Sequence, residues 1–248
     1  MPMCELPAYA PYVPQLVPVE WGENIWTVEG PEVSYRLAGV PLPCPTRMTV
    51  VRLDDGSLLL HSPVFYSSQL SAALTALGPV AVIVAPNEYH YLNVDDWGAA
   101  HPSATVYATR AVGAKVKVEC KFFDNDPMVL SQIGLPSKLI DLGKFKEAVF
   151  FHQPSQTLIV TDLMQNFEAS RVRTRSTRLL LRAGGATGPN GQPSVEIRLA
   201  ARKHRAAFAD GVQQMLEWRP TKIILSHGSC YRSDAISELE KAFAWHRH

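Results

Sequence analysis

Five residues with metal-ligand or proton-transfer chemistry each lie just after an apolar run of the sequence. These residues are His61, Glu88, His90, Asp162 and His227. Loops at the carboxyl ends of strands are anchored by a rigid core, so these side chains are expected to converge. Neutral imidazole and carboxylate are ligands that zinc, iron and manganese accept. The pattern therefore predicts either one divalent metal ion or metal-free acid–base chemistry by the same residues.

Within this set, the residues divide by role. His90, Asp162 and His227 are the predicted metal ligands, with Glu88 or His61 as an additional ligand or proton-transfer group. Each also has a structural interpretation, because histidines at strand ends are often simply hydrogen-bonded and Asp commonly binds backbone amides of its own turn. The sequence leaves both interpretations open.

Hydrophobic patterning supplies the elements that must position these residues. The expected strands are 25–28, 34–37, 48–53, 57–61, 80–85, 105–108, 149–152, 157–161 and 222–226. The expected helices are 69–77, 94–100, 206–218 and 234–245. An Asp-Gly turn at 54–56 predicts a hairpin, and the unbroken apolar run at 80–85 is typical of a strand buried on both faces. This order favours an α+β fold with two mixed sheets flanked by helices, rather than one parallel doubly wound sheet.

Composition bounds the class of protein. The 248 residues carry a formal charge of +1 and are 46% hydrophobic, which is enough for one large core without a structural metal. No apolar run approaches the roughly 20 residues of a membrane span, and the start does not resemble a secretory signal. The four cysteines are far apart, which indicates reduced thiols and a cytoplasmic location. The absence of G-x-S-x-G leaves serine-type hydrolysis without support.

Two segments differ from the rest of this single expected domain, 1–248. Residues 1–20 are rich in proline and predict an extended N-terminal arm. Residues 168–205 carry nine arginines and lysines against two glutamates, with a glycine-rich stretch at 184–191, and predict a basic surface insertion with a flexible tip. A solvated surface, or one partly paired with acidic residues elsewhere in the chain, is favoured there over nucleic-acid or acidic-substrate binding.

Several short motifs occur in an order that resembles a known fold family. They are Pro-Thr-Arg-Met-Thr-Val-Val-Arg-Leu at 45–53, His-Ser-Pro at 61–63, Ala-Pro-Asn at 85–87, Phe-Phe-His at 150–152, Leu-Ile-Val-Thr-Asp-Leu at 158–163 and Ile-Leu-Ser-His-Gly at 224–228. Over residues 18–245 the chain resembles an uncharacterised branch of the metallo-β-lactamase-fold superfamily. The resemblance implies an αββα sandwich with its site in a cleft at the sheet edges.

The chain departs from the superfamily's metal-binding pattern. The family's loop has the form His-x-His-x-Asp-His, and the corresponding positions here are Pro86, Glu88, His90 and Tyr91. The family's third-strand histidine falls near Lys144, and only Asp162 and His227 carry over directly. In the family these two are the bridging carboxylate and a ligand of the second metal. The resemblance therefore implies a degenerate site for one ion rather than two.

Together these observations predict a metal-dependent hydrolase acting on a small ester, thioester or lactone-like substrate. Arg47, Asn87 and Lys144 are the predicted substrate-binding residues, with Arg47 at the mouth of the cleft holding an anionic group. The alternative is a non-catalytic protein that keeps the fold and cleft for ligand binding and has lost its metal centre. The oligomeric state is left open.

Overall fold

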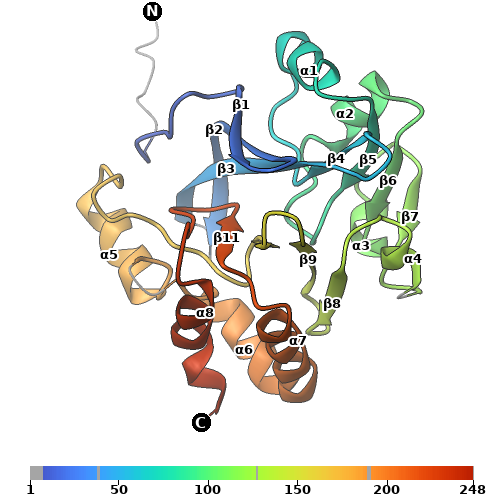
Figure 1. The fold of residues 1–248 in the computed structure, drawn as a ribbon. Coiled ribbons are helices and arrows are strands. Elements are labelled where there is room, and N and C mark those ends of the chain that lie inside the picture. Colours follow the sequence, from blue (N-terminus) through green and yellow to red (C-terminus); the bar gives the residue numbers. More distant parts are fainter. Residues whose placement is uncertain (1–7, 38–39, 127, 189–190, 248) are drawn as a thin grey trace, which may run out of the picture.

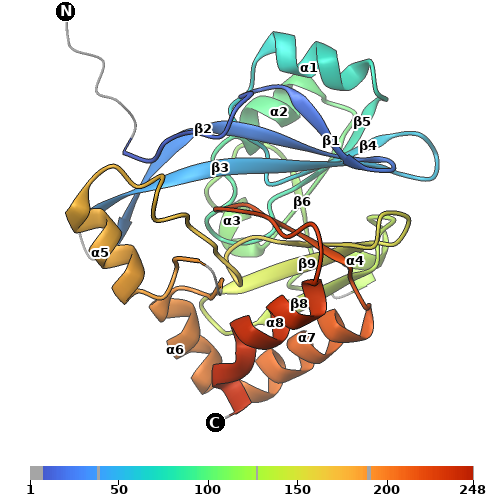
Figure 2. The same cartoon turned by 60° about the vertical axis from the view of Figure 1, so that its left-hand side comes forward.

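Two β-sheets pack face to face, with helices on their outer faces (Figures 1 and 2). The structure is a computed structural model that describes residues 8–37, 40–126, 128–188 and 191–247. Both sheets contain parallel and antiparallel strand pairs. The αββα sandwich with two mixed sheets predicted from the sequence is therefore confirmed.

The larger sheet follows chain order. Its strands are β1 (Pro18–Gly22), β2 (Ile25–Leu37), β3 (Val40–Arg52), β4 (Leu58–His61), β5 (Val80–Val84), β6 (Thr105–Ala108) and β7 (Cys120–Phe122). The first four strands are antiparallel, and β4 to β7 are parallel. The predicted hairpin joins β3 to β4 through Gly56, whose φ of 82° suits glycine.

The smaller sheet has the order β11-β10-β9-β8. These strands are β8 (Ser137–Asp141), β9 (Lys146–His152), β10 (Thr157–Val160) and β11 (Lys222–Leu225). Strands β10 and β11 run parallel, whereas β9 is antiparallel to both of its neighbours. The carboxyl ends of β10 and β11 therefore meet at one edge of this sheet.

Strand alternation divides the core into layers. In β10, Leu158 and Val160 belong to the cluster under the helices, whereas Ile159 belongs to the cluster between the sheets.

Helices cover the outer faces of both sheets. Helices α1 (Ser68–Thr75) and α2 (Val94–Ala100) cover the larger sheet, and α6 (Val195–Lys203), α7 (Arg205–Glu217) and α8 (Ala235–Phe243) cover the smaller one (Figure 2). The chain also forms the one-turn helices α3 (Arg110–Gly113) and α4 (Met128–Ser131) and the 3-10 turn η1 (Ala244–Arg247).

The described parts of the two atypical segments take definite structures. Within 168–205, α5 (Arg175–Ala183) precedes α6, and residues 189–190 of the predicted flexible tip lie outside the described residues. In the arm, residues 1–7 lie outside the described part, but the Tyr9 side chain is buried with its ring 5.8 Å from that of Phe167. No helix in the described ranges is long and apolar enough to cross a membrane.

Candidate metal centre

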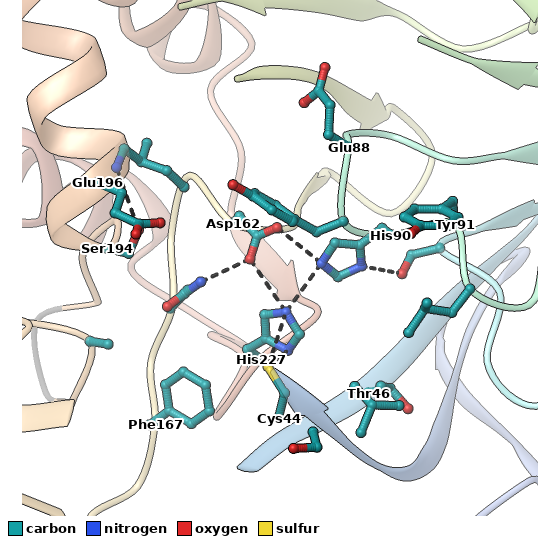
Figure 3. A pocket seen from close by; sticks show the side chains of 18 of the residues that line it. Cys44, Thr46, Glu88, His90, Tyr91, Asp162, Phe167, Ser194, Glu196 and His227 are labelled. Carbon is teal, nitrogen blue, oxygen red and sulfur yellow. Dashed lines mark hydrogen bonds and ion pairs between the residues drawn. The ribbon is translucent and has the colours of Figure 1, made fainter. Parts of the chain in front are cut away.

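His90, Asp162 and His227 point toward one another beyond the carboxyl ends of strands from both sheets (Figure 3). His90 lies in the loop after β5, Asp162 follows β10 and His227 follows β11. The His90 Nε2 atom is 3.1 Å from Asp162 Oδ2 and 3.1 Å from His227 Nε2. One ligand atom from each residue lies within 4.8 Å of the other two. The structure thus brings together all three predicted metal ligands.

Hydrogen bonds on the far side of each imidazole orient its Nε2 atom toward the cluster. His227 Nδ1 lies 2.8 Å from the carbonyl oxygen of Pro45, which only accepts, so Nδ1 carries the hydrogen. His90 Nδ1 lies 2.6 Å from Ser62 Oγ. Fixing the outer nitrogen of a histidine in this way is a regular feature of metal-ligating imidazoles.

The electrostatics of the cluster favour a positive charge at its centre. Burial alone would raise the pKa of Asp162, but His90 and His227 hold it well below its usual range. Burial alone would lower the pKa of His227, but the Cys44 sulfur and the Asp162 carboxylate hold it well above its usual range. The pKa of His90 is lowered by burial. Two imidazoles and a carboxylate facing one another have the donor set and polarity to hold a divalent cation.

Asn87 connects the His90 loop to the Asp162 carboxylate. Its side chain is fully buried, and its Nδ2 donates to Asp162 Oδ2 at 2.8 Å. Its Oδ1 accepts from the backbone N–H groups of Tyr89 and His90 at 2.9 and 3.1 Å, which fixes the turn that carries His90. Gln165 Nε2 donates to the other carboxylate oxygen at 2.8 Å. Asn87, predicted to bind substrate, therefore holds the candidate ligands in position through hydrogen bonds and does not line the cavity beside them.

Glu147 supports the turn that carries Asp162, and sequence reasoning did not find it. Its buried carboxylate accepts from the backbone N–H groups of Thr161, Asp162 and Leu163 at 2.8, 2.9 and 3.1 Å. Burial and the negative charge of Asp162 raise the pKa of Glu147. The available signal was an acidic residue directly before four apolar residues of β9, where an unpaired charge is costly.

Ser62 and Cys44 also contact the cluster without having been predicted. Ser62 follows β4 and has a φ of 56°, an uncommon conformation for a residue with a side chain. Cys44 lies on β3, and its Sγ is 3.6 Å from Nδ1 and 3.8 Å from Nε2 of His227. Neither belonged to a metal-ligand spacing in the sequence, so only the pairing of the strands reveals them.

His61 and Glu88 lie outside the three-residue cluster. The His61 ring is buried between the sheets, edge-on to Phe150, and neither ring nitrogen has a hydrogen-bond partner among the described residues. Burial and the charge of His90 lower the pKa of His61 to about 3. The Glu88 carboxylate points away from the cluster (Figure 3) and accepts from the Lys146 backbone N–H at 3.0 Å. Burial raises the pKa of Glu88.

Arg47 and Lys144 occupy positions unlike those expected for substrate-binding residues. The Arg47 guanidinium is buried and donates to the carbonyl oxygens of Leu225 and, at 2.9 Å, Gly228. It also forms an ion pair with Glu29 at 2.6 Å. The two contacts with carbonyl oxygens stabilise the loop that carries His227. Lys144 is exposed on the turn between β8 and β9. Neither residue lines the cavity beside the cluster.

This cavity has a volume of about 670 Å³ and includes all three candidate ligands in its wall (Figure 3). The volume falls within the range of roughly 300–1,000 Å³ found for small-molecule sites. Glu88 and Cys44 also line it, whereas His61 does not. The candidate ligands are thus accessible from a space large enough for a substrate.

Comparison with solved structures identifies the fold. The chain is similar to DIM-1 metallo-β-lactamase exposed to ceftazidime, with 13% identity, a TM-score of 0.52 and coverage of 95% of this chain and 98% of that one. It is similar to TMB-1, with 10% identity, a TM-score of 0.56 and coverage of 95% and 100%. It is also similar to FIM-1 from Pseudomonas aeruginosa in the mono-zinc form, with 12% identity, a TM-score of 0.51 and coverage of 91% and 92%.

These similarities show that the protein has the metallo-β-lactamase fold, as the sequence motifs implied. A comparison with models of protein families gave no match, and a comparison with curated proteins gave none either. The function is therefore argued from the site itself, because one fold supports many activities.

Proposed function

We propose that the protein is a metal-dependent hydrolase that holds one divalent ion between His90, Asp162 and His227. The convergence of their ligand atoms within 4.8 Å carries this proposal. Zinc, iron and manganese all suit two imidazoles and a carboxylate. When bound, such an ion polarises a carbonyl oxygen and activates water near neutral pH. FIM-1, which shares the fold, was solved with one zinc, and this supports a single-ion site.

The surrounding residues would position the ligands and handle protons. Ser62 and the Pro45 carbonyl orient the two imidazoles, while Asn87 and Gln165 hold the Asp162 carboxylate. Of the two predicted proton-transfer residues, Glu88 lines the cavity and His61 does not. We therefore keep Glu88 as the proposed proton-transfer residue; its carboxylate points away from the three ligands in this structure, so it must turn toward the cavity to act.

The substrate proposed is a small ester, thioester or lactone. Hydrolysis of each begins at a carbonyl carbon, and the cavity gives a carbonyl group access to the candidate ligands. The oxygen ligands and imidazoles of the site are suited to an ion that polarises such a carbonyl.

Metal analysis of purified protein tests the proposal. Cells would be grown in medium supplemented with zinc, iron and manganese, and the metal content measured by mass spectrometry. We expect about one ion per wild-type chain, trace metal in the His90→Ala/His227→Ala double variant, and wild-type content in His204→Ala, which changes an exposed histidine outside the site. Hydrolysis of p-nitrophenyl acetate, a thioester and a γ-lactone should depend on the metal.

Trace metal in the wild-type protein would reject the hydrolase proposal. It would favour the alternative of a binding protein that keeps the fold and cavity without a metal centre.

A further inference from the structure

Residues of the segment 168–205, which the sequence predicted to be a basic surface insertion, form one wall of the cavity. Five apolar residues of this segment line the cavity: Leu180, Leu181, Ala186, Val195 and Ile197. They lie on α5, on α6 and between them. Leu181, Ala186 and Ile197 are buried, so this wall is packed against the protein rather than loosely placed over it.

The apolar surface continues up to the candidate ligands. Phe167 lines the cavity, and its ring stacks nearly parallel to the imidazole of His227, with 6.0 Å between centroids (Figure 3). Leu92 and Tyr91 line the cavity from the His90 loop. A ligand whose reacting group lies at the cluster can therefore extend along apolar side chains toward α5 and α6.

The described part of the α5–α6 wall presents no cationic side chain to the cavity. None of the arginines and lysines described within 168–205 lines the cavity; Arg175, Arg178 and Arg182 of α5 are exposed. Apart from the two histidines, the basic lining side chain is Lys115, which donates to the Glu88 carbonyl oxygen and lies 4.6 Å from the Tyr91 ring centroid. Glu88 and Glu196 line the cavity as well. The α5–α6 wall therefore favours an uncharged chain, whereas the cationic groups of the lining lie at the candidate ligands and at Lys115.

We propose that the cavity binds the uncharged aliphatic acyl chain of its substrate, with α5 and α6 forming the wall that determines chain-length preference. This inference rests on the proposed function for the reacting end of the ligand, but the binding of the chain itself does not require hydrolysis. The chain lies against Leu180, Leu181 and Ile197, and the carbonyl group lies beside His90, Asp162 and His227.

Uncharged, non-hydrolysed probes test chain binding directly. N-methyl alkanamides with acyl groups of four, six, eight and ten carbons would be titrated into metal-free and metal-loaded protein by calorimetry. Each added methylene should tighten binding by about two- to fourfold, until the chain fills the cavity. Equal affinity across the series, or no measurable binding of any of the amides, would overturn the inference.

Two adjacent leucines provide a matched pair of variants. Leu180 is 48% exposed and lines the cavity, whereas Leu179 is 69% exposed and does not. Leu180→Glu should weaken binding of the eight-carbon amide by about tenfold or more, because it places a charge against the chain. Leu179→Glu should leave binding unchanged. Val195→Glu and Leu199→Glu form the same kind of pair on α6, with Val195 in the cavity wall. Equal effects within both pairs would contradict the assigned wall.

The outcomes separate this inference from the proposed function. Chain-length-dependent amide binding without hydrolysis of any ester would reject the hydrolase and retain the acyl cavity. Metal-dependent hydrolysis with the same kcat/KM for two-carbon and eight-carbon esters would retain the hydrolase and reject the acyl cavity.

Discussion

The candidate metal centre and the α5–α6 wall face the same cavity but are built in opposite ways. The centre uses side chains at the carboxyl ends of strands, and these are held by hydrogen bonds with Asn87, Glu147 and Ser62. The wall uses two short helices with half-exposed leucines, tied together by contacts such as Arg198 to the Gly184 carbonyl. The sheets thus fix the positions of reacting groups, whereas a peripheral segment shapes the space for the ligand. Substitutions in the centre should cost stability and metal binding, and those in the wall should alter mainly ligand preference.

The largest loss of stability is expected when Glu147 is removed. Glu147→Ala leaves three backbone N–H groups without their acceptor in a buried turn and should lower the free energy of unfolding by about 3–5 kcal/mol. Urea denaturation measures this change. The exposed Glu240→Ala variant should stay within about 0.5 kcal/mol of wild type. Similar losses in both variants would show that Glu147 stabilises the candidate metal centre no more than an exposed glutamate stabilises the surface.

Ser62→Gly tests the support of His90 without disturbing the backbone. Glycine adopts the φ of 56° found here readily, so the main change is loss of the hydroxyl that contacts His90 Nδ1. Metal affinity, measured by competition with a chelator, should fall about 10- to 100-fold. Ser62→Ala should lose the same affinity but be less stable than Ser62→Gly, because alanine is strained at this φ. Wild-type affinity in both variants would show that the hydroxyl does not support His90.

His61 offers a pH-dependent test within the sandwich. Burial lowers its pKa to about 3, so below the unfolded-state pKa of about 6.5 the unfolded chain takes up a proton that the native protein does not. This histidine therefore lowers stability by up to about 1.4 kcal/mol per pH unit as the pH falls from about 6.5 to 3.

His61→Leu should remove that pH dependence and raise stability at pH 7 by about 1 kcal/mol, because two unpaired buried nitrogens are lost. Urea denaturation at pH 7 and pH 5 measures both effects, with hydrolysis unchanged. A loss of hydrolysis would instead indicate that His61, and not Glu88, transfers the proton.

The smallest effects are expected on the outer face of α5. Arg175→Gln and Arg182→Gln change exposed side chains that do not line the cavity. Their stability should stay within about 0.5 kcal/mol of wild type, and the affinity for the eight-carbon amide should be unchanged. A clear change in amide affinity would indicate that the arginines, rather than the apolar side of the segment, govern binding.

Local patterns predicted much of the fold because they act over short distances. The β3–β4 hairpin, β5 and β11 followed from turn residues and apolar runs. The length of the β2–β3 ribbon was not predicted, because the prolines at 41, 43 and 45 argue against a strand. These prolines are tolerated because β4 pairs only with Thr49–Arg52 of β3. The part of β3 that carries the prolines pairs with β2 on one side and does not pair with β4 on the other.

The candidate site was predictable only where chemistry coincides with strand ends. His90, Asp162 and His227 were found because a polar residue after an apolar run is visible in one dimension. Glu147 was missed because the backbone N–H groups that donate to it lie 14–16 residues away, across a strand pair. The apolar side of α5 was missed because the arginine count dominated its interpretation, although helical geometry places Leu181 on the buried side.

Anomalous X-ray diffraction tests the central claim most directly. Crystals of protein loaded with zinc would be measured at the zinc absorption edge. The account predicts an anomalous peak about 2.0–2.2 Å from His90 Nε2, an Asp162 carboxylate oxygen and His227 Nε2. A loaded crystal with no peak among these three residues, or with its peak at another group of side chains, would contradict it.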